Sequence, residues 1–267
     1  MAWNFNGSTD YLAAPAAPVT AAPLTIACWF RKTAGASSDH ELIGISQPGT
    51  DHTFILSAGD GGLSVLYAAA YTGGSWGPAT STALFAANEW NHAAAVFAAN
   101  DSRFVYLNGG NKGTSTLSVE PLGLNTTSVG YVAIATPTEK FPGDIAEVAI
   151  WSAALTDEEI ALLAKGFSPL CLWHRLPNLV MYQDLMRPLD RPGIGPALTS
   201  YGGTSVAAHP RMIYPTSCLL GVFFPKRYAV PYRLVAAAAQ AGRAAQGAAS
   251  LAGAEHGTTY PLGEVSS

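Results

Sequence analysis

The stretch that decides the fold is residues 24–30, LTIACWF, in which two kinds of position alternate. Leu24, Ile26, Cys28 and Phe30 fall on one face of an extended chain, because successive side chains of a strand point to opposite faces. This period of two predicts a strand with one face buried in a core. Cys28 lies on that face, so we interpret it as a small buried hydrophobic residue.

Short segments of the same kind recur along the chain up to about residue 155, separated by Gly, Pro, Asn and Asp. Residues 60–62 (DGG) and 108–110 (NGG) are hairpin signals, because glycine accepts the positive φ that such turns require. Many short strands with frequent turns predict an all-β fold, an antiparallel β-sandwich of the jelly-roll kind. The expected strands are residues 24–30, 41–46, 53–57, 63–67, 90–97, 103–107, 129–134 and 145–151.

One short helix is well signalled after the last of these strands. Thr156 is an N-cap residue and Glu159 follows three positions later, which is the spacing of a capping box. Asp157 and Glu158 place negative charge in the first turn, where the helix dipole favours it. Gly166 predicts the end of the helix. We expect this helix to cover one end of the sandwich.

The character of the chain changes near residue 186, where prolines begin to interrupt any regular element. We place a β-sandwich domain in residues 1–185 and an extended C-terminal arm in residues 186–267. Residues 170–185 could form a further strand, which Pro177 restricts to an edge or a bend. The arm keeps aromatic residues and contains an Ala-rich segment with little to bury. We therefore expect it to make assembly contacts through apolar anchors, namely Phe223, Phe224, Tyr228 and Tyr232.

The composition of the 267-residue chain also favours contact with other subunits. Charged residues make up only 12%, about half of the roughly 25% typical of soluble domains. The net charge of −4 argues against a nucleic-acid-binding protein, and no apolar run reaches the roughly 18 residues of a membrane span. The N-terminus lacks the features of a signal peptide. Cys28, Cys171 and Cys218 form neither an even set nor a close pair, so we expect synthesis in a reducing compartment. A disulfide or a metal site made by Cys171 with Cys218 is the alternative.

Several phrases of the sequence, taken in order, point to a known family. They are residues 5–12 (FNGSTDYL), 24–30 (LTIACWF), 90–97 (WNHAAAVF), 105–109 (VYLNG), 141–151 (FPGDIAEVAIW) and 154–160 (ALTDEEI). Together they resemble the laminin-G-like branch of the concanavalin-A-like lectin/glucanase superfamily, over roughly the first two thirds of the chain. Residues 166–215 resemble the tail of such proteins encoded in tailed-bacteriophage and prophage structural clusters, which implies a virion.

The superfamily hosts lectins, hydrolases and structural modules, so membership does not fix the function. Its glucanases carry Glu-x-Asp-x-x-Glu on one strand, which places nucleophile and general acid on the same face. Asp144 and Glu147 match the second half of this motif, but Pro142 stands in place of the first glutamate. A proline can be neither nucleophile nor base. We interpret Glu147 as a polar outward or edge residue, and we expect the protein not to be an enzyme.

Candidate ligand-binding residues remain. A structural calcium ion is possible, because oxygen ligands suit Ca²⁺ and such folds often hold one; Asp10 and Asp144 are the candidate metal ligands, and simple turn capping is the alternative. His92 is expected to be packed or hydrogen-bonded rather than catalytic. Trp76 lies in a glycine-rich loop, residues 71–78, where an exposed ring can stack on a sugar. A Trp packed onto the rim of the sandwich is the alternative there.

Three functions compete. The first is a bacteriophage virion structural protein, a capsid-decorating or cement subunit with a lectin-like exposed domain and an arm that grips its neighbours. The second is a tail-associated adhesin that binds host glycan, and the third is a glycan hydrolase. Tail fibres usually attach through their N-termini, whereas here the compact domain comes first, which favours decoration. The expected partners are other virion subunits, in a homo-oligomeric assembly, and a glycan. We expect the chain in the virion, after synthesis in the host cytoplasm.

Overall fold

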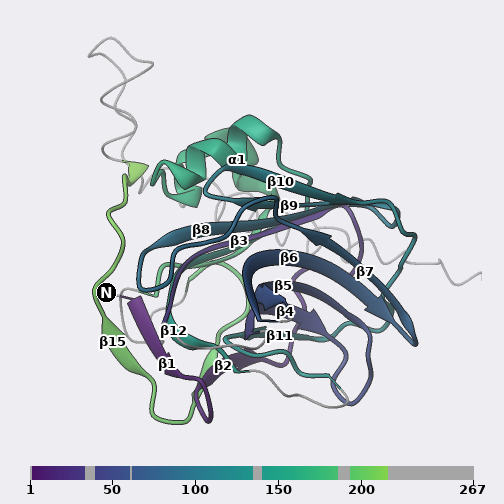
Figure 1. Cartoon of the computed structure of the whole chain (residues 1–267), viewed down its shortest axis with the longest axis horizontal. Helices are drawn as coiled ribbons and strands as arrows, with labels where there is room; N and C mark the ends of the chain where they lie inside the picture. The colour runs from purple at the N-terminus through teal and green to yellow at the C-terminus, as the bar shows by residue number, and fades with distance from the viewer. Residues whose placement is uncertain (1, 34–39, 61, 135–139, 186–192, 216–267) are drawn as a thin grey trace, which may run out of the picture. The chain divides into compact units, whose positions relative to one another are not determined.

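The computed structural model describes residues 2–33, 40–60, 62–134, 140–185 and 193–215, which form two facing antiparallel sheets (Figure 1). The elements are β1 (Ala2–Asn6), β2 (Tyr11–Ala14), β3 (Leu24–Lys32), β4 (His40–Ser46), β5 (Thr53–Asp60), β6 (Leu63–Thr72), β7 (Ser75–Thr80), β8 (Asn91–Ala99), β9 (Ser102–Leu107), β10 (Gly110–Ser115), β11 (Thr126–Val129), β12 (Pro142–Trp151), α1 (Asp157–Ala164), two 3₁₀ turns η1 (Pro169–Cys171) and η2 (Trp173–Asn178), β13 (Leu179–Gln183), β14 (Thr199–Tyr201) and β15 (Ser205–Ala207).

The sandwich predicted from the sequence is confirmed. The eight-stranded sheet has the order β10-β9-β8-β3-β12-β1-β15, with β13 paired to the second half of β12. The seven-stranded sheet has the order β14-β2-β11-β4-β5-β6-β7. Strands adjacent in space are often distant in the chain, as in a jelly roll.

The core lies between the two sheets, and β3 contributes to it as its period of two predicts. Leu24, Ile26, Cys28 and Phe30 are all buried and pack in one cluster with residues of the opposite sheet such as Leu56. Cys28 is a free thiol, as expected for a small buried hydrophobic residue. Cys171 contradicts the expectation that the cysteines of this chain are reduced. Cys171 is disulfide-bonded, while Cys218 lies outside the described residues.

Two predicted strands are wrong in their bounds. Residues 170–185 were expected to form one further strand, but η1 and η2, with Pro177 inside η2, occupy its first half and only β13 is extended. Residues 129–134 were expected to be extended, but β11 ends at Val129. Gly130 follows with φ +74°, and a Cβ there would lie 2.9 Å from the ring of Phe5, so the chain turns at a position that suits only glycine. Val132 then lies over Gly44 of β4, since a Cβ on Gly44 would meet the Val132 side chain at 2.4 Å. This segment therefore passes over the outer face of the seven-stranded sheet.

The predicted helix is confirmed, including both hydrogen bonds of its capping box, but it covers the outer face of a sheet rather than an end of the sandwich. Its residues Ile160 and Leu163 pack with Val96 and Trp151, whose side chains lie on the outer face of the eight-stranded sheet. Figure 1 shows α1 beside β8, β9 and β10, on the side away from the seven-stranded sheet. In the described part of the chain, none of the helices is long and apolar enough to cross a membrane.

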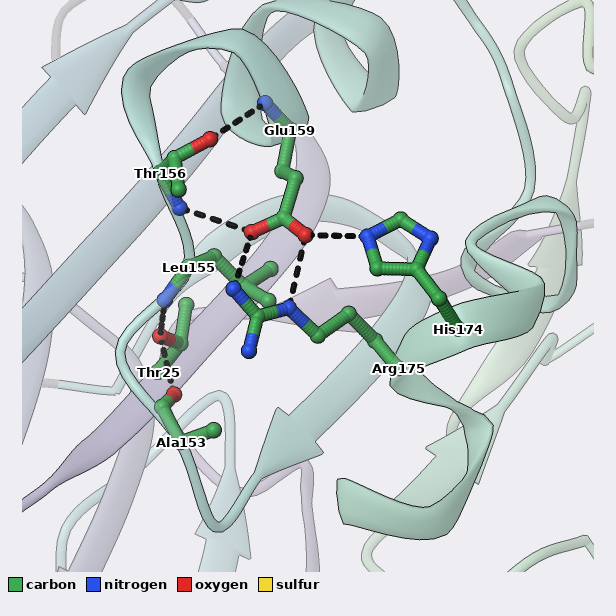
Figure 2. Close-up of polar contacts among 7 residues, drawn as sticks. All are labelled: Thr25, Ala153, Leu155, Thr156, Glu159, His174 and Arg175. Carbon is green, nitrogen blue, oxygen red and sulfur yellow. Dashed lines mark hydrogen bonds and ion pairs between the residues drawn. The ribbon is translucent and has the colours of Figure 1, made fainter.

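Glu159 lies at the centre of the hydrogen bonds that connect α1 with η2, as Figure 2 shows. Its carboxylate accepts from the backbone N–H of Thr156 at 2.8 Å, from Arg175 Nε at 2.6 Å and Nη2 at 3.0 Å, and lies 2.6 Å from His174 Nε2. Arg175 and His174 belong to η2. The side chain of Thr25 on β3 in turn accepts from the backbone N–H of Leu155, just before the helix. One carboxylate thus ties α1 to η2.

The compact unit continues well beyond residue 185, where the sequence-based domain ends. It spans Met1–Cys218, and the boundary at residue 185 therefore falls inside it. We call residues 199–215 the belt: β14 pairs with β2, β15 pairs with β1, and Ile213 exchanges backbone hydrogen bonds with Gly166 and Ser168. Strands of three residues carry too few alternations to be recognised from sequence. The arm anchors Phe223, Phe224, Tyr228 and Tyr232 lie outside the described residues.

Candidate ligand-binding site

Five side chains form a line across the outer face of the eight-stranded sheet, which we call the polar row: Asn4, Arg31, Trp90, Asp144 and Ser205. Ser205 lies opposite Asn4, Asn4 opposite Asp144, and Asp144 opposite Arg31. Phe30, beside Arg31 on β3, and Ile145, beside Asp144 on β12, belong to the core, so alternation turns the row outward. The guanidinium of Arg31 lies 5.5 Å from the ring centre of Trp90, which ends the row.

Hydrogen bonds hold the middle of the polar row in one geometry. Asp144 accepts from Arg31 Nε at 2.7 Å and from Asn4 Nδ2 at 2.8 Å, and Arg31 Nη2 lies 2.6 Å from the same carboxylate. The Asp144 side chain is 5% exposed and that of Arg31 is 34% exposed. The guanidinium carries five N–H bonds, of which these contacts use two, leaving three for a ligand.

A pocket of about 400 Å³ lies over the polar row. Its volume falls within the range of small-molecule sites, roughly 300–1,000 Å³. Polar groups dominate its wall, and the belt closes one side through β15. The lining residues are Asn4, Arg31, Lys32, Thr33, Asn88, Asp144, Ser205, Val206 and Ala207. Such a site suits a ligand rich in hydroxyl and carbonyl groups.

The two predicted calcium ligands lie in separate hydrogen-bond networks. Asp10 is buried and accepts from Thr9 Oγ1 at 2.9 Å and from the backbone N–H of Gly203 at 2.8 Å. Asp144 is engaged by Asn4 and Arg31 instead. Within the described ranges, no three His, Cys, Asp or Glu residues gather as a metal-binding group. The contacts of Asp10 match the turn-capping alternative, and calcium binding stays a prediction.

Glu147 departs from its predicted role. It points to the outer face, but it is only 2% exposed and is not at an edge, since β13 and the belt cover it. The hydroxyl of Tyr182 donates to it at 2.8 Å and that of Tyr214 at 2.7 Å, while His209 Nε2 lies 3.3 Å away. A register shift between Ala146 and Ala149 and a φ of +55° at Glu147 mark a β-bulge, which aims this extra side chain outward.

Burial raises the pKa of both Tyr182 and Tyr214, and the negative charge of Glu147 raises it further. Both hydroxyls therefore stay protonated and serve as donors. Glu147 does not line the pocket of the polar row. Asp144 and Glu147, three residues apart on β12, thus belong to different environments.

Trp76 lies on β7, at the edge of the seven-stranded sheet, rather than in a loop. It is 43% exposed, and its ring meets those of Tyr67 and Tyr71 edge-on, with centroids 5.5 and 5.8 Å apart. This aromatic group belongs to the other sheet, so it shares no site with the polar row. Sugar stacking on Trp76 stays a prediction.

His92 is a packed residue, as expected. It is buried, meets the ring of Trp29 edge-on at 5.5 Å, and burial lowers its pKa to about 3. The imidazole is therefore neutral at ordinary pH.

Sequence reasoning found Asp144 but missed Asn4, Arg31, Trp90 and Ser205. Arg31 carried a usable signal, because it continues the outward positions of the strand that begins at Leu24. Its proximity to Asn4 and Ser205 depends on pairing between strands far apart in the chain. Periodicity within one strand does not contain that information.

Comparisons with known proteins agree with this fold. Residues 6–161, more than half of the chain, match the family described as the concanavalin A-like lectin/glucanases superfamily, Laminin_G_3. None of the curated proteins matches the chain in sequence.

Three of the similar solved structures show the range of the likeness. A native heptameric SAP-like pentraxin from Limulus polyphemus has a TM-score of 0.57 and 16% identity, over 78% of this chain and 94% of that one. A putative carbohydrate binding protein from Bacteroides ovatus ATCC 8483 has a TM-score of 0.57 and 17% identity, over 79% and 61%. The CBM40 of the Ruminococcus gnavus IT-sialidase has a TM-score of 0.50 and 16% identity, over 60% and 95%. At such identities the likeness concerns the fold alone. On the family match, the chain belongs to the concanavalin A-like lectin/glucanases superfamily.

Proposed function

We propose that this protein is a non-catalytic glycan-binding domain and that the polar row is its binding site. The observation that carries the proposal is the hydrogen-bonded set of Asn4, Asp144 and Arg31 at the floor of a pocket, beside Trp90. Sugars offer hydroxyl groups that donate and accept hydrogen bonds, together with apolar faces that stack on aromatic rings. Two proteins of similar fold, the putative carbohydrate binding protein from Bacteroides ovatus and the CBM40 of the Ruminococcus gnavus IT-sialidase, support the same class of ligand.

Binding without cleavage is supported by the carboxylates. Glycoside hydrolysis generally needs two, on opposite sides of the scissile bond. Asp144 is the only carboxylate that the described residues contribute to the pocket, and Arg31 and Asn4 engage it. Glu147, the other residue of the glucanase-like motif, is buried under Tyr182 and Tyr214.

The test of glycan binding is a glycan array probed with the full chain, followed by calorimetric titration of the best ligand. Trp90→Ala and Asn4→Ala should each weaken binding about 10-fold or more, equivalent to about 1.4 kcal/mol. Trp76→Ala is the matched control, because it removes an exposed aromatic ring from the other sheet. Absence of any binding at millimolar concentration would overturn the proposal, and so would binding that only Trp76→Ala removes.

For the setting of this domain, we propose a bacteriophage particle in which it serves as an exposed capsid-decorating subunit; a tail-associated adhesin is the alternative. The low charge content and the position of the compact domain ahead of residues 219–267 support decoration. Quantitative mass spectrometry of purified particles tests the placement. Hundreds of copies per particle would support decoration, a handful would support a tail component, and absence from particles would contradict both.

A further inference from the structure

One wall of the pocket belongs to the belt. Ser205, Val206 and Ala207 of β15 line it, while the other walls come from residues that precede Leu185. β15 has three residues and, among the described strands, pairs with β1 alone, and Val206 is 61% exposed. Strand pairing of this length and so little burial hold a segment weakly. Other contacts must fix its position.

Those contacts are made by His209 and Tyr214, which follow β15 in the belt. His209 Nε2 lies 3.3 Å from Glu147 Oε1, and Tyr214 donates to the same oxygen at 2.7 Å. Tyr182, from β13, donates to the other carboxylate oxygen at 2.8 Å. A buried carboxylate is costly unless donors surround it. One of the two hydroxyl donors to Glu147 therefore arrives with the belt, and His209 of the belt lies beside the same carboxylate, so Glu147 and the belt stabilise each other.

We propose that Glu147 is a positioning residue for the ligand pocket: it holds the belt through Tyr214 and His209, and so sets the place of β15 in the pocket wall. The effect on ligand affinity rests on the glycan-binding function proposed above. The effect of Glu147 on the position of the belt does not depend on that function. Glu147 touches no ligand and acts only through the belt.

The experiment compares two Tyr→Phe variants of the full chain. Tyr214→Phe removes the hydroxyl that ties the belt to Glu147. Tyr106→Phe, the matched control, removes a hydroxyl that donates to Asp157 at 2.7 Å, on β9 and away from the belt. Hydrogen exchange of peptides covering β15 reports the belt, exchange of β3 and β8 reports the sandwich, and titration with the array-selected glycan reports the pocket.

Tyr214→Phe should speed exchange in β15 about 10-fold and weaken glycan binding several-fold, while exchange in β3 and β8 stays unchanged. Combining it with His209→Gln should enlarge both effects, and Tyr106→Phe should produce neither. If the wild type binds no glycan but Tyr214→Phe still speeds exchange in β15, the role of Glu147 in positioning the belt is supported and the proposed glycan-binding function is contradicted.

The inference is overturned if wild-type binding is intact and the Tyr214 variants leave β15 exchange unchanged. Faster exchange with unchanged affinity would also overturn it, because β15 would then not set the pocket. The same would follow if Tyr106→Phe produced equal changes at β15.

Discussion

The outer face of the eight-stranded sheet has a covered half and an open half, and both are organised around carboxylates. In the covered half, Glu159 of α1 accepts from the N-cap Thr156 and from Arg175 of η2, and Glu147 of β12 accepts from Tyr214 of the belt, so each carboxylate holds a segment that covers the sheet. In the open half, the donors to Asp144 come from the neighbouring strands β1 and β3. That carboxylate fastens no cover, and it leaves part of Arg31 available to a ligand. The origin of the donors distinguishes a structural carboxylate from one in a binding site.

The largest expected effect lies in the covered half. Glu147→Ala removes the buried carboxylate that accepts from the hydroxyls of Tyr182 and Tyr214, and we expect the free energy of unfolding to fall by about 3 kcal/mol. Urea denaturation measures it. The control is Glu158→Ala, which removes an exposed carboxylate from α1. A loss no larger than that of the control would show that Glu147 does not fasten the belt.

Low pH should destabilise the same covered half, because it protonates Glu159. Burial alone would raise the pKa of Glu159, but hydrogen bonds from Arg175, Thr156 and His174 outweigh it and lower the pKa below the ordinary value of 4.5. A carboxyl whose pKa is depressed by folding stabilises the protein above its unfolded pKa, and this stability is lost as the pH falls through the folded pKa. We expect the melting temperature to fall below about pH 4.5, and Glu159→Gln to reduce that fall. An identical pH profile in the variant would contradict the assignment.

In the open half, we expect a substitution to reduce glycan affinity more than stability. Asp144→Asn weakens an ion pair whose arginine is part-exposed, so we expect at most about 1 kcal/mol of destabilisation. Glycan affinity should fall about 10-fold or more, because Arg31 loses its fixed geometry. Thermal melting and titration of the same preparation separate the two effects. A strongly destabilised variant with normal affinity would reverse the roles assigned to the two halves.

Chelation should have the smallest effect. Asp10 and Asp144 already accept hydrogen bonds from protein donors, so we expect EDTA to leave the melting temperature unchanged. A ligand bound only by the folded state would stabilise it. A fall in melting temperature on chelation, absent in Asp144→Ala, would establish the calcium site that the sequence suggests.

The sequence predicted what local patterns encode. The alternation in residues 24–30 and the capping box at Thr156 both correspond to the observed β3 and α1. The belt escaped prediction because its strands are three residues long and its partners lie about 200 positions earlier. Glu147 was misjudged because a β-bulge and a positive φ leave no mark on the pattern of side chains. The polar row needed strand register, which only the folded chain supplies.

A crystal structure of the full chain soaked with the glycan that the array selects tests most directly whether the polar row binds sugar. We expect density for the sugar over Asn4, Asp144 and Arg31, with one sugar face against Trp90 and β15 along its side. Density beside Trp76, on the seven-stranded sheet, with an empty polar row, would contradict it.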